Sequence, residues 1–147
     1  MKNGYSDSGS ITYGIHQIDE VAQMLWALRD RCAVFTFIGS LGAGKTTLVR
    51  SLLKQAGVVG SIASPTFTYV NIYENREGHL LYHFDCYRIT ALDNFLQAGF
   101  DEYLYQKNSW CFIEWPEVVM PIVDHRACHI VIDYLSDDQR MLSFRVV

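Results

Sequence analysis

The stretch that decides the fold is Gly39-Ser40-Leu41-Gly42-Ala43-Gly44-Lys45-Thr46, which fits the pattern G-x-x-x-x-G-K-[ST] at every fixed position. A nearly continuous apolar run at 33–38 precedes it, and such a run is typical of a buried strand. Residues 45–56 follow with a helical pattern that Gly57 closes. A strand, a glycine-rich turn and a helix in this order favour a phosphate-binding loop over an ordinary turn.

The residues of this loop predict how it would hold a nucleotide. The glycines let successive backbone N–H groups turn toward one point, and the start of the helix adds its partial positive charge. Lys45 would reach the β- and γ-phosphates, and the Thr46 hydroxyl would complete the shell of a Mg²⁺ ion. The adjacent Thr47 is a candidate ligand of the α-phosphate.

Two acidic residues, Asp85 and Glu114, each come directly after an apolar run that predicts a strand, at 80–84 and 110–113. Because the usual metal carboxylate of such a loop lies at the carboxyl end of a neighbouring strand, both are candidates. Mg²⁺ prefers one or two carboxylates together with water and phosphate oxygens. Either residue could bind the ion, while the other holds a water ligand or polarises the attacking water. The alternative for each is a surface acid at a strand end.

Three further residues carry less specific signals. Thr66 follows the Ser-Pro pair at 64–65, in the region where NTPases place a sensor of the γ-phosphate; a plain turn is the alternative. Trp115 comes directly after Glu114 and could stack on a base, pack in the core or face a partner. His83 lies within the strand expected at 80–84, and we interpret it as a half-buried histidine with satisfied hydrogen bonds.

The remaining pattern mixes helices with strands and ends in an antiparallel pair. This predicts an α/β fold with a partly parallel sheet. Residues 1–10 are expected to be a flexible lead-in, and 11–147 a single domain. Helices are expected at 18–29, 45–56 and 91–98, and strands at 33–38, 67–73, 80–84, 110–113, 127–135 and 141–147.

Composition narrows the function classes. The chain has 147 residues, of which 50% are hydrophobic and 19% charged, and this suits one globular domain. Its 12 basic and 16 acidic residues give a net charge of -4, which argues against binding nucleic acid without a partner. No membrane-length apolar run or signal-peptide core occurs, so we expect a cytoplasmic protein. Buried, reduced thiols are expected at Cys32, Cys86, Cys111 and Cys128.

Four linked motifs follow one another along the chain: G-x-L-G-A-G-K-T-T at 39–47, S-P-T-F at 64–67, Y-H-F-D-x-Y-R at 82–88 and I-E-W-P at 113–116. Together they resemble the TsaE family, which comprises bacterial ATPases required for the threonylcarbamoyladenosine modification of tRNA. The resemblance implies a P-loop NTPase-like α/β domain in three layers, with a mixed, partly parallel central sheet.

The resemblance also implies a site for ATP and Mg²⁺ at the loop. Thr46 and Glu114 would lie nearest the metal, with Asp85 supporting the metal or a water. Arg140, in the last hairpin, matches a basic position near the nucleotide. The residues expected to act in catalysis are Lys45, Thr66, Asp85 and Glu114. Those expected to bind the nucleotide are Leu41, Gly42, Ala43, Gly44, Lys45, Thr46, Thr47, Trp115 and Arg140.

The partners implied by the resemblance are the TsaD and TsaB subunits, which would transfer the group themselves. This chain would contact tRNA only indirectly and would reset the complex by hydrolysing ATP. A small-molecule or nucleotide kinase is the alternative, although little of the chain is left to form an arginine-rich lid. A GTPase would need N-K-x-D and D-x-x-G, and neither string occurs. A partner-docking scaffold without activity is disfavoured because Lys45, Thr46, Asp85 and Glu114 are all intact.

Overall fold

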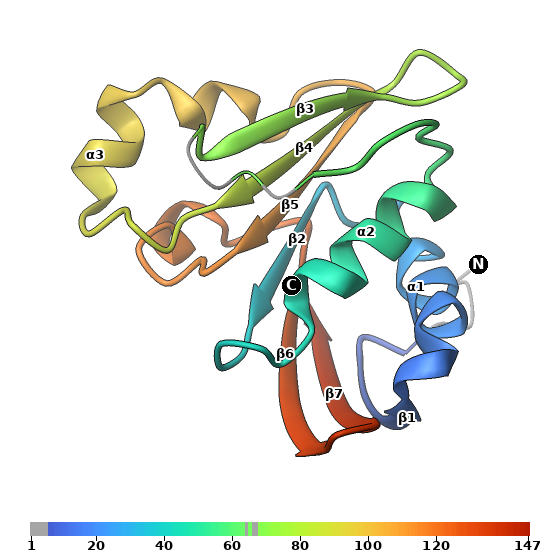
Figure 1. Ribbon diagram of the computed structural model, residues 1–147. Coiled ribbons are helices and arrows are strands. Elements are labelled where there is room, and N and C mark those ends of the chain that lie inside the picture. Colours follow the sequence, from blue (N-terminus) through green and yellow to red (C-terminus); the bar gives the residue numbers. More distant parts are fainter. Residues whose placement is uncertain (1–5, 64, 66–67) are drawn as a thin grey trace.

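The centre of the computed structural model is a seven-stranded sheet with the order β1-β7-β6-β2-β5-β4-β3 (Figure 1). The structure describes residues 6–63, 65 and 68–147. The strands are β1 Ser8–Gly14, β2 Val34–Ile38, β3 Val70–Glu74, β4 Leu80–Asp85, β5 Ser109–Glu114, β6 Ala127–Ser136 and β7 Gln139–Val146. The helices are α1 Ile18–Trp26, α2 Lys45–Gln55 and α3 Leu92–Gln97, with short 3₁₀ helices at η1 Ile15–Gln17, η2 Phe100–Tyr103 and η3 Met120–Ile122.

The four central strands are parallel and the outer pairs are antiparallel. Strand β2 pairs in parallel with β5 and β6, and β4 pairs in parallel with β5. The pairs β1–β7, β6–β7 and β3–β4 are antiparallel. The expected α/β class with a mixed, partly parallel sheet is therefore confirmed. Because β2, β4 and β5 run the same way, their carboxyl ends meet at one edge of the sheet.

Apolar side chains pack on both faces of the sheet. Helices α1 and α2 cover one face, where Leu48 and Leu52 of α2 join a core with Phe35 and Phe112 (Figure 1). The other face packs against α3 and the segments around it; its core includes Phe84 and Ile113 of the sheet, with Phe95 and Leu104. Alternate residues of a strand point to opposite faces, so neighbours such as Phe112 and Ile113 divide between the two cores.

The N-terminal prediction was wrong in part. Strand β1 begins at Ser8 and pairs with β7, with Ser8 opposite Arg145, so residues 8–10 are not a lead-in. Serine and glycine have low strand propensity, but the edge of β7 offers backbone partners that a local pattern cannot reveal. The other expected helices and strands occur, with ends shifted by a few residues.

Two smaller expectations concern burial and membranes. All four cysteines are buried and free, as expected. Burial raises the pKa of the Cys86 thiol to about 12, so this thiol is protonated at neutral pH. Within the described residues, no helix has both the length and the apolar character needed to cross a membrane.

Candidate nucleotide site

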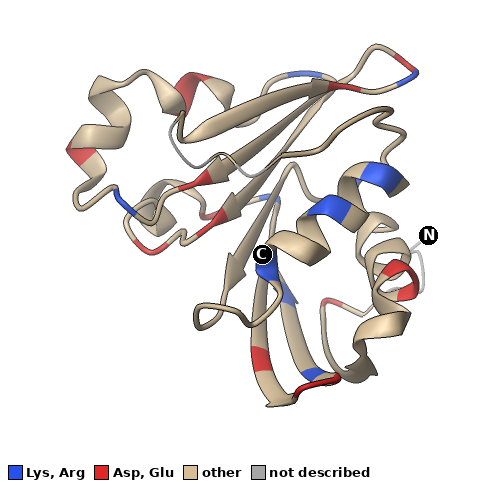
Figure 2. Cartoon of the chain, in the orientation of Figure 1, with Lys and Arg blue, Asp and Glu red and all other residues tan. Residues whose placement is uncertain are grey.

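A cavity of about 260 Å³ lies at the edge where the parallel strands end. Three chain segments form it: the loop between β2 and α2, the end of β4 and the end of β5. Figure 2 shows acidic residues where β4 and β5 end, and these strands end at Asp85 and Glu114. The lining residues are Leu41, Gly42, Gly44, Lys45, Thr46, Thr47, Asp85, Glu114 and Trp115.

The loop depends on glycine at two positions for different reasons. Gly44 caps the N-terminus of α2 with a φ of 103°, a conformation that costs other residues energy. At Gly39, a Cβ atom would lie 2.7 Å from the carbonyl oxygen of Ile132, so only glycine fits this close approach. The N-terminus of α2 consequently faces the cavity and presents its partial positive charge there.

Lys45 is folded against its own loop. Its Nζ donates hydrogen bonds to the carbonyl oxygens of Gly39 at 2.5 Å and Ser40 at 3.1 Å. The Trp115 ring covers the ammonium, with 3.9 Å between Nζ and the ring centroid. Burial lowers the pKa of Lys45, while the nearby carboxylates, Glu114 foremost, oppose this shift. The ammonium is thus held in the wall of the cavity, between the loop carbonyls and the Trp115 ring.

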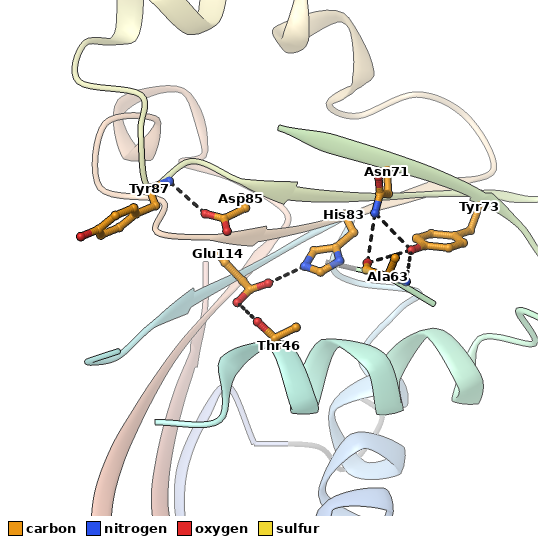
Figure 3. A network of polar contacts seen from close by, with 8 residues as sticks. All are labelled: Thr46, Ala63, Asn71, Tyr73, His83, Asp85, Tyr87 and Glu114. Atoms are coloured by element: carbon orange, nitrogen blue, oxygen red, sulfur yellow. Dashed lines mark hydrogen bonds and ion pairs between the residues drawn. The ribbon is translucent and has the colours of Figure 1, made fainter. Parts of the chain in front are cut away.

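A chain of short hydrogen bonds links Thr46, Glu114 and His83 (Figure 3). The Thr46 hydroxyl donates to Glu114 Oε1 at 2.6 Å, and His83 Nε2 lies 2.5 Å from Glu114 Oε2. Glu114 is only 2% exposed and His83 is fully buried. The structure therefore brings together the hydroxyl and the carboxylate that the sequence places 68 positions apart.

The interpretation of His83 was wrong. The residue is completely buried, and no described residue bonds its Nδ1 atom. The parallel register pairs His83 with Phe112 and Asp85 with Glu114, which puts all four side chains on the α2 face. In the sequence, each acid follows a ring side chain by two positions, in the strings H-x-D at 83–85 and F-x-E at 112–114. This spacing indicates a contact between His83 and Glu114 only once β4 and β5 are known to be neighbours.

Asp85 lies beside Glu114 at the end of the adjacent strand (Figure 3). Its Oδ1 accepts a hydrogen bond of 3.0 Å from the backbone N–H of Tyr87, which orients the carboxylate. Asp85 is more exposed than Glu114 and does not share its contact with Thr46. The two acids thus occupy one site in different environments.

Trp115 lines the cavity. Its φ of 54° lies in the left-handed region, which a tryptophan rarely adopts. The ring packs on Tyr87, with centroids 4.9 Å apart, and covers Lys45. Strained backbone of this kind concentrates at functional sites, and here it keeps the indole over the Lys45 ammonium.

Two of the expected nucleotide residues lie beside the cavity and not in its wall. Ala43, a residue of the loop itself, is buried and packs into the core. The Nε atom of Arg140 donates to the Ala43 carbonyl oxygen at 2.9 Å, and Nη1 donates to the Ser136 carbonyl oxygen at 2.6 Å. The guanidinium also lies over the Tyr134 ring, 4.7 Å from its centroid. Arg140 therefore ties the β6–β7 hairpin to the phosphate loop.

Thr66, the expected sensor, lies outside the described residues. The segment leading to it is anchored by polar contacts from β3 (Figure 3). The Tyr73 hydroxyl and the Asn71 amide both donate to the Ala63 carbonyl oxygen, at 3.1 and 3.0 Å. The backbone N–H of Ala63 donates back to the Tyr73 hydroxyl at 3.1 Å. These contacts fix the start of the loop next to the sheet.

The donor set at the cavity fits a magnesium ion held jointly with a nucleotide. In the described part of the chain, no group of three or more His, Cys, Asp or Glu side chains could enclose a metal. The cavity instead offers the Thr46 hydroxyl and the Glu114 and Asp85 carboxylates. Mg²⁺ takes one or two carboxylates and completes its shell with waters and phosphate oxygens, which matches this incomplete set.

A glycine-rich loop between a central parallel strand and a helix, with two acids at the ends of the neighbouring strands, defines an α/β domain of the P-loop type. Residues 13–142 match the family described as threonylcarbamoyl adenosine biosynthesis protein TsaE. The chain belongs to the TsaE family.

Relatives from distant bacteria support this membership. The TsaE protein of Haemophilus influenzae is 38% identical over 117 residues, which covers 79% of this chain and 73% of that protein. The TsaE protein of Bacillus subtilis is 34% identical over 128 residues, covering 86% of this chain and 78% of the relative. The crystal structure of Bacillus subtilis YdiB is similar with a TM-score of 0.70 at 26% identity, and the match covers 97% of this chain and 89% of that one.

Proposed function

We propose that this chain is the Mg²⁺-dependent ATPase subunit of the cytoplasmic machinery that makes N6-threonylcarbamoyladenosine in tRNA. The relatives named above are called tRNA threonylcarbamoyladenosine biosynthesis proteins, which supports the pathway. The observation that carries the ATPase proposal is the hydrogen bond between Thr46 and Glu114, formed in the cavity that Lys45 also lines. A hydroxyl and a carboxylate in contact beside a phosphate loop form the protein's share of a magnesium–nucleotide site.

Different residues of the cavity would bind the phosphates and the metal ion. The N-terminus of α2 and the Lys45 ammonium bind the phosphates, and the Thr46 hydroxyl and Glu114 would hold the ion. Bound Mg²⁺ would offset the charge that builds up on the phosphate oxygens. Lys45 donates two hydrogen bonds, to Gly39 and Ser40, and the Trp115 ring covers its ammonium, so a bound phosphate would compete with these contacts for the ammonium.

In this proposal Asp85 is the carboxylate that acts on the attacking water. Both oxygens of Glu114 already have partners, at Thr46 and at His83. Asp85 lines the same cavity, is more exposed and is oriented by the Tyr87 backbone. It is therefore the better-placed carboxylate to polarise a water or to bind a water ligand of the ion.

We propose TsaB and TsaD as the partners, with tRNA contacted only through them. Of the described residues that line the cavity, Lys45 alone is cationic, and Arg140 donates to the carbonyl oxygens of Ala43 and Ser136. In P-loop enzymes an arginine supplied in cis or in trans contributes about 10³ to 10⁵ in rate. Leu41 lines the cavity and Tyr87 packs on Trp115, which also lines it; these large side chains are 84% and 62% exposed and suit a protein surface docked there.

Product analysis tests the proposal. The chain is incubated with Mg²⁺ and ATP or GTP, with and without TsaB and TsaD, and free phosphate is measured. Phosphate release from ATP supports an ATPase. Phosphate moved to an added small molecule would favour a kinase, and no turnover under any condition would favour a docking scaffold.

A further inference from the structure

We propose that His83 is a positioning residue of the magnesium site and holds the Glu114 carboxylate in the orientation that meets Thr46. The inference rests on the proposed function, since it concerns the same metal site. His83 itself does not line the cavity, so any effect on the site must pass through Glu114.

The contact between the two residues is buried on all sides. His83 is 0% exposed and Glu114 is 2% exposed, and Nε2 lies 2.5 Å from Oε2. A carboxylate that binds Mg²⁺ is ionised and can only accept a hydrogen bond, so in the metal-bound site of this proposal Nε2 is the donor. With Oε1 accepting from Thr46 and Oε2 from His83, the carboxylate is held at both oxygens. Its rotation about the last side-chain bond is thereby fixed.

Packing alone does not account for a histidine at this position. Its neighbours on the same face include Leu81 and Phe112, and both are fully buried and apolar. Nδ1 has no hydrogen-bond partner among the described residues, which is unfavourable for a buried ring nitrogen. A leucine would pack here without that penalty, so the contact of Nε2 with Glu114 explains the choice of residue.

The consequence is a defined role in metal binding. Groups that hydrogen-bond a metal ligand orient it, and their loss typically reduces metal affinity or activity about 10- to 100-fold. Without His83, Glu114 would keep its contact to Thr46 but lose the partner that fixes its other oxygen. We therefore expect weaker coupling between Mg²⁺ and the nucleotide, while the phosphate loop itself is unchanged.

The test compares His83→Leu, which removes the donor, with His83→Gln, whose amide N–H can replace the Nε2 proton. The matched control is His129→Leu. His129 Nδ1 lies 2.7 Å from the Thr36 hydroxyl in the same sheet, and Thr36 alternates with Phe35 and Phe37 and so faces away from α2. The control therefore removes a histidine–side-chain contact without touching Glu114.

The measurement is the affinity for a fluorescent ATP analogue, first in EDTA and then across a Mg²⁺ titration. In EDTA we expect all variants to bind like the wild type. The Mg²⁺ concentration at half effect should rise about 10- to 100-fold in His83→Leu. It should stay near the wild-type value in His83→Gln and in His129→Leu.

Several results would overturn the inference. A wild-type Mg²⁺ midpoint in folded His83→Leu would remove the positioning role, and so would a defect in folded His83→Gln as large as that of His83→Leu. If circular dichroism shows that His83→Leu does not fold, His83→Asn replaces it, because its shorter amide does not reach Glu114. A wild-type chain that binds the analogue without any effect of Mg²⁺ would instead refute the metal site of the proposed function, and this inference with it.

Discussion

Replacing Glu114 by glutamine removes one charge from the site and almost nothing else. The carboxylate accepts two hydrogen bonds, from the Thr46 hydroxyl and from His83 Nε2. The amide has one oxygen, which can keep the bond from His83, while its NH₂ group turns to Thr46. The Thr46 hydroxyl can rotate and accept, because a hydroxyl serves as donor or acceptor. We therefore expect Glu114→Gln to fold with stability close to that of the wild type.

We expect Glu114→Gln to lower the rate of ATP hydrolysis. An amide oxygen carries no full charge, so it binds Mg²⁺ and orders the ion's waters less well. Loss of a single catalytic or charge-stabilising group typically costs on the order of 10²-fold or more in rate. A hundredfold loss corresponds to about 2.7 kcal/mol in the activation free energy. The change is therefore large in rate although the variant differs from the wild type by a few atoms.

The assay is steady-state phosphate release at saturating ATP with TsaB and TsaD present, repeated over a range of Mg²⁺ concentrations. Thermal unfolding of the same sample checks that the variant is folded. Asp85→Asn serves as the comparison, and we expect it also to reduce turnover strongly. An active Glu114→Gln beside an inactive Asp85→Asn would refute the reasoning and reverse the assignment of the two acids.

Three further changes probe the loop and the core. Lys45→Ala should weaken ATP binding or abolish turnover, because Lys45 is the only cation among the described residues lining the cavity. Nucleotide titration checks this, and wild-type affinity together with wild-type turnover would exclude a phosphate-binding role for the loop. Arg140→Ala should weaken ATP and ADP binding by similar factors, since the guanidinium holds the Ala43 carbonyl; a loss for ATP alone would indicate a direct γ-phosphate contact. Leu52→Ala should destabilise the fold by about 2–5 kcal/mol in denaturant unfolding because it leaves a cavity in the core, whereas the exposed Val59→Ala should change stability by less than about 0.5 kcal/mol.

The phosphate loop and its setting could be predicted because they are local. The glycine spacing, the apolar run before it and the helical pattern after it each act within a few residues. The same holds for Asp85 and Glu114, which could be recognised as acids at strand ends. The first strand could not be predicted, because Ser8 to Ser10 owe their conformation to β7 at the other end of the chain.

The role of His83 could not be predicted from the sequence for a related reason. Whether it meets Glu114 depends on β4 and β5 being parallel neighbours in one register, which the sequence does not state. The contact of Arg140 with Ala43 likewise joins residues 97 positions apart. In both cases the residue type could be noted from the sequence, but its partner is set by the sheet order.

The most direct test of the central claim is the rate of phosphate release from ATP with and without TsaB and TsaD, at saturating ATP and Mg²⁺. Lys45 is the only cation among the described residues that line the cavity, so the isolated chain should hydrolyse ATP slowly. Assembly with the partners should accelerate release clearly, and Lys45→Ala should abolish the gain. Equal rates with and without the partners would contradict the partner-dependent mechanism.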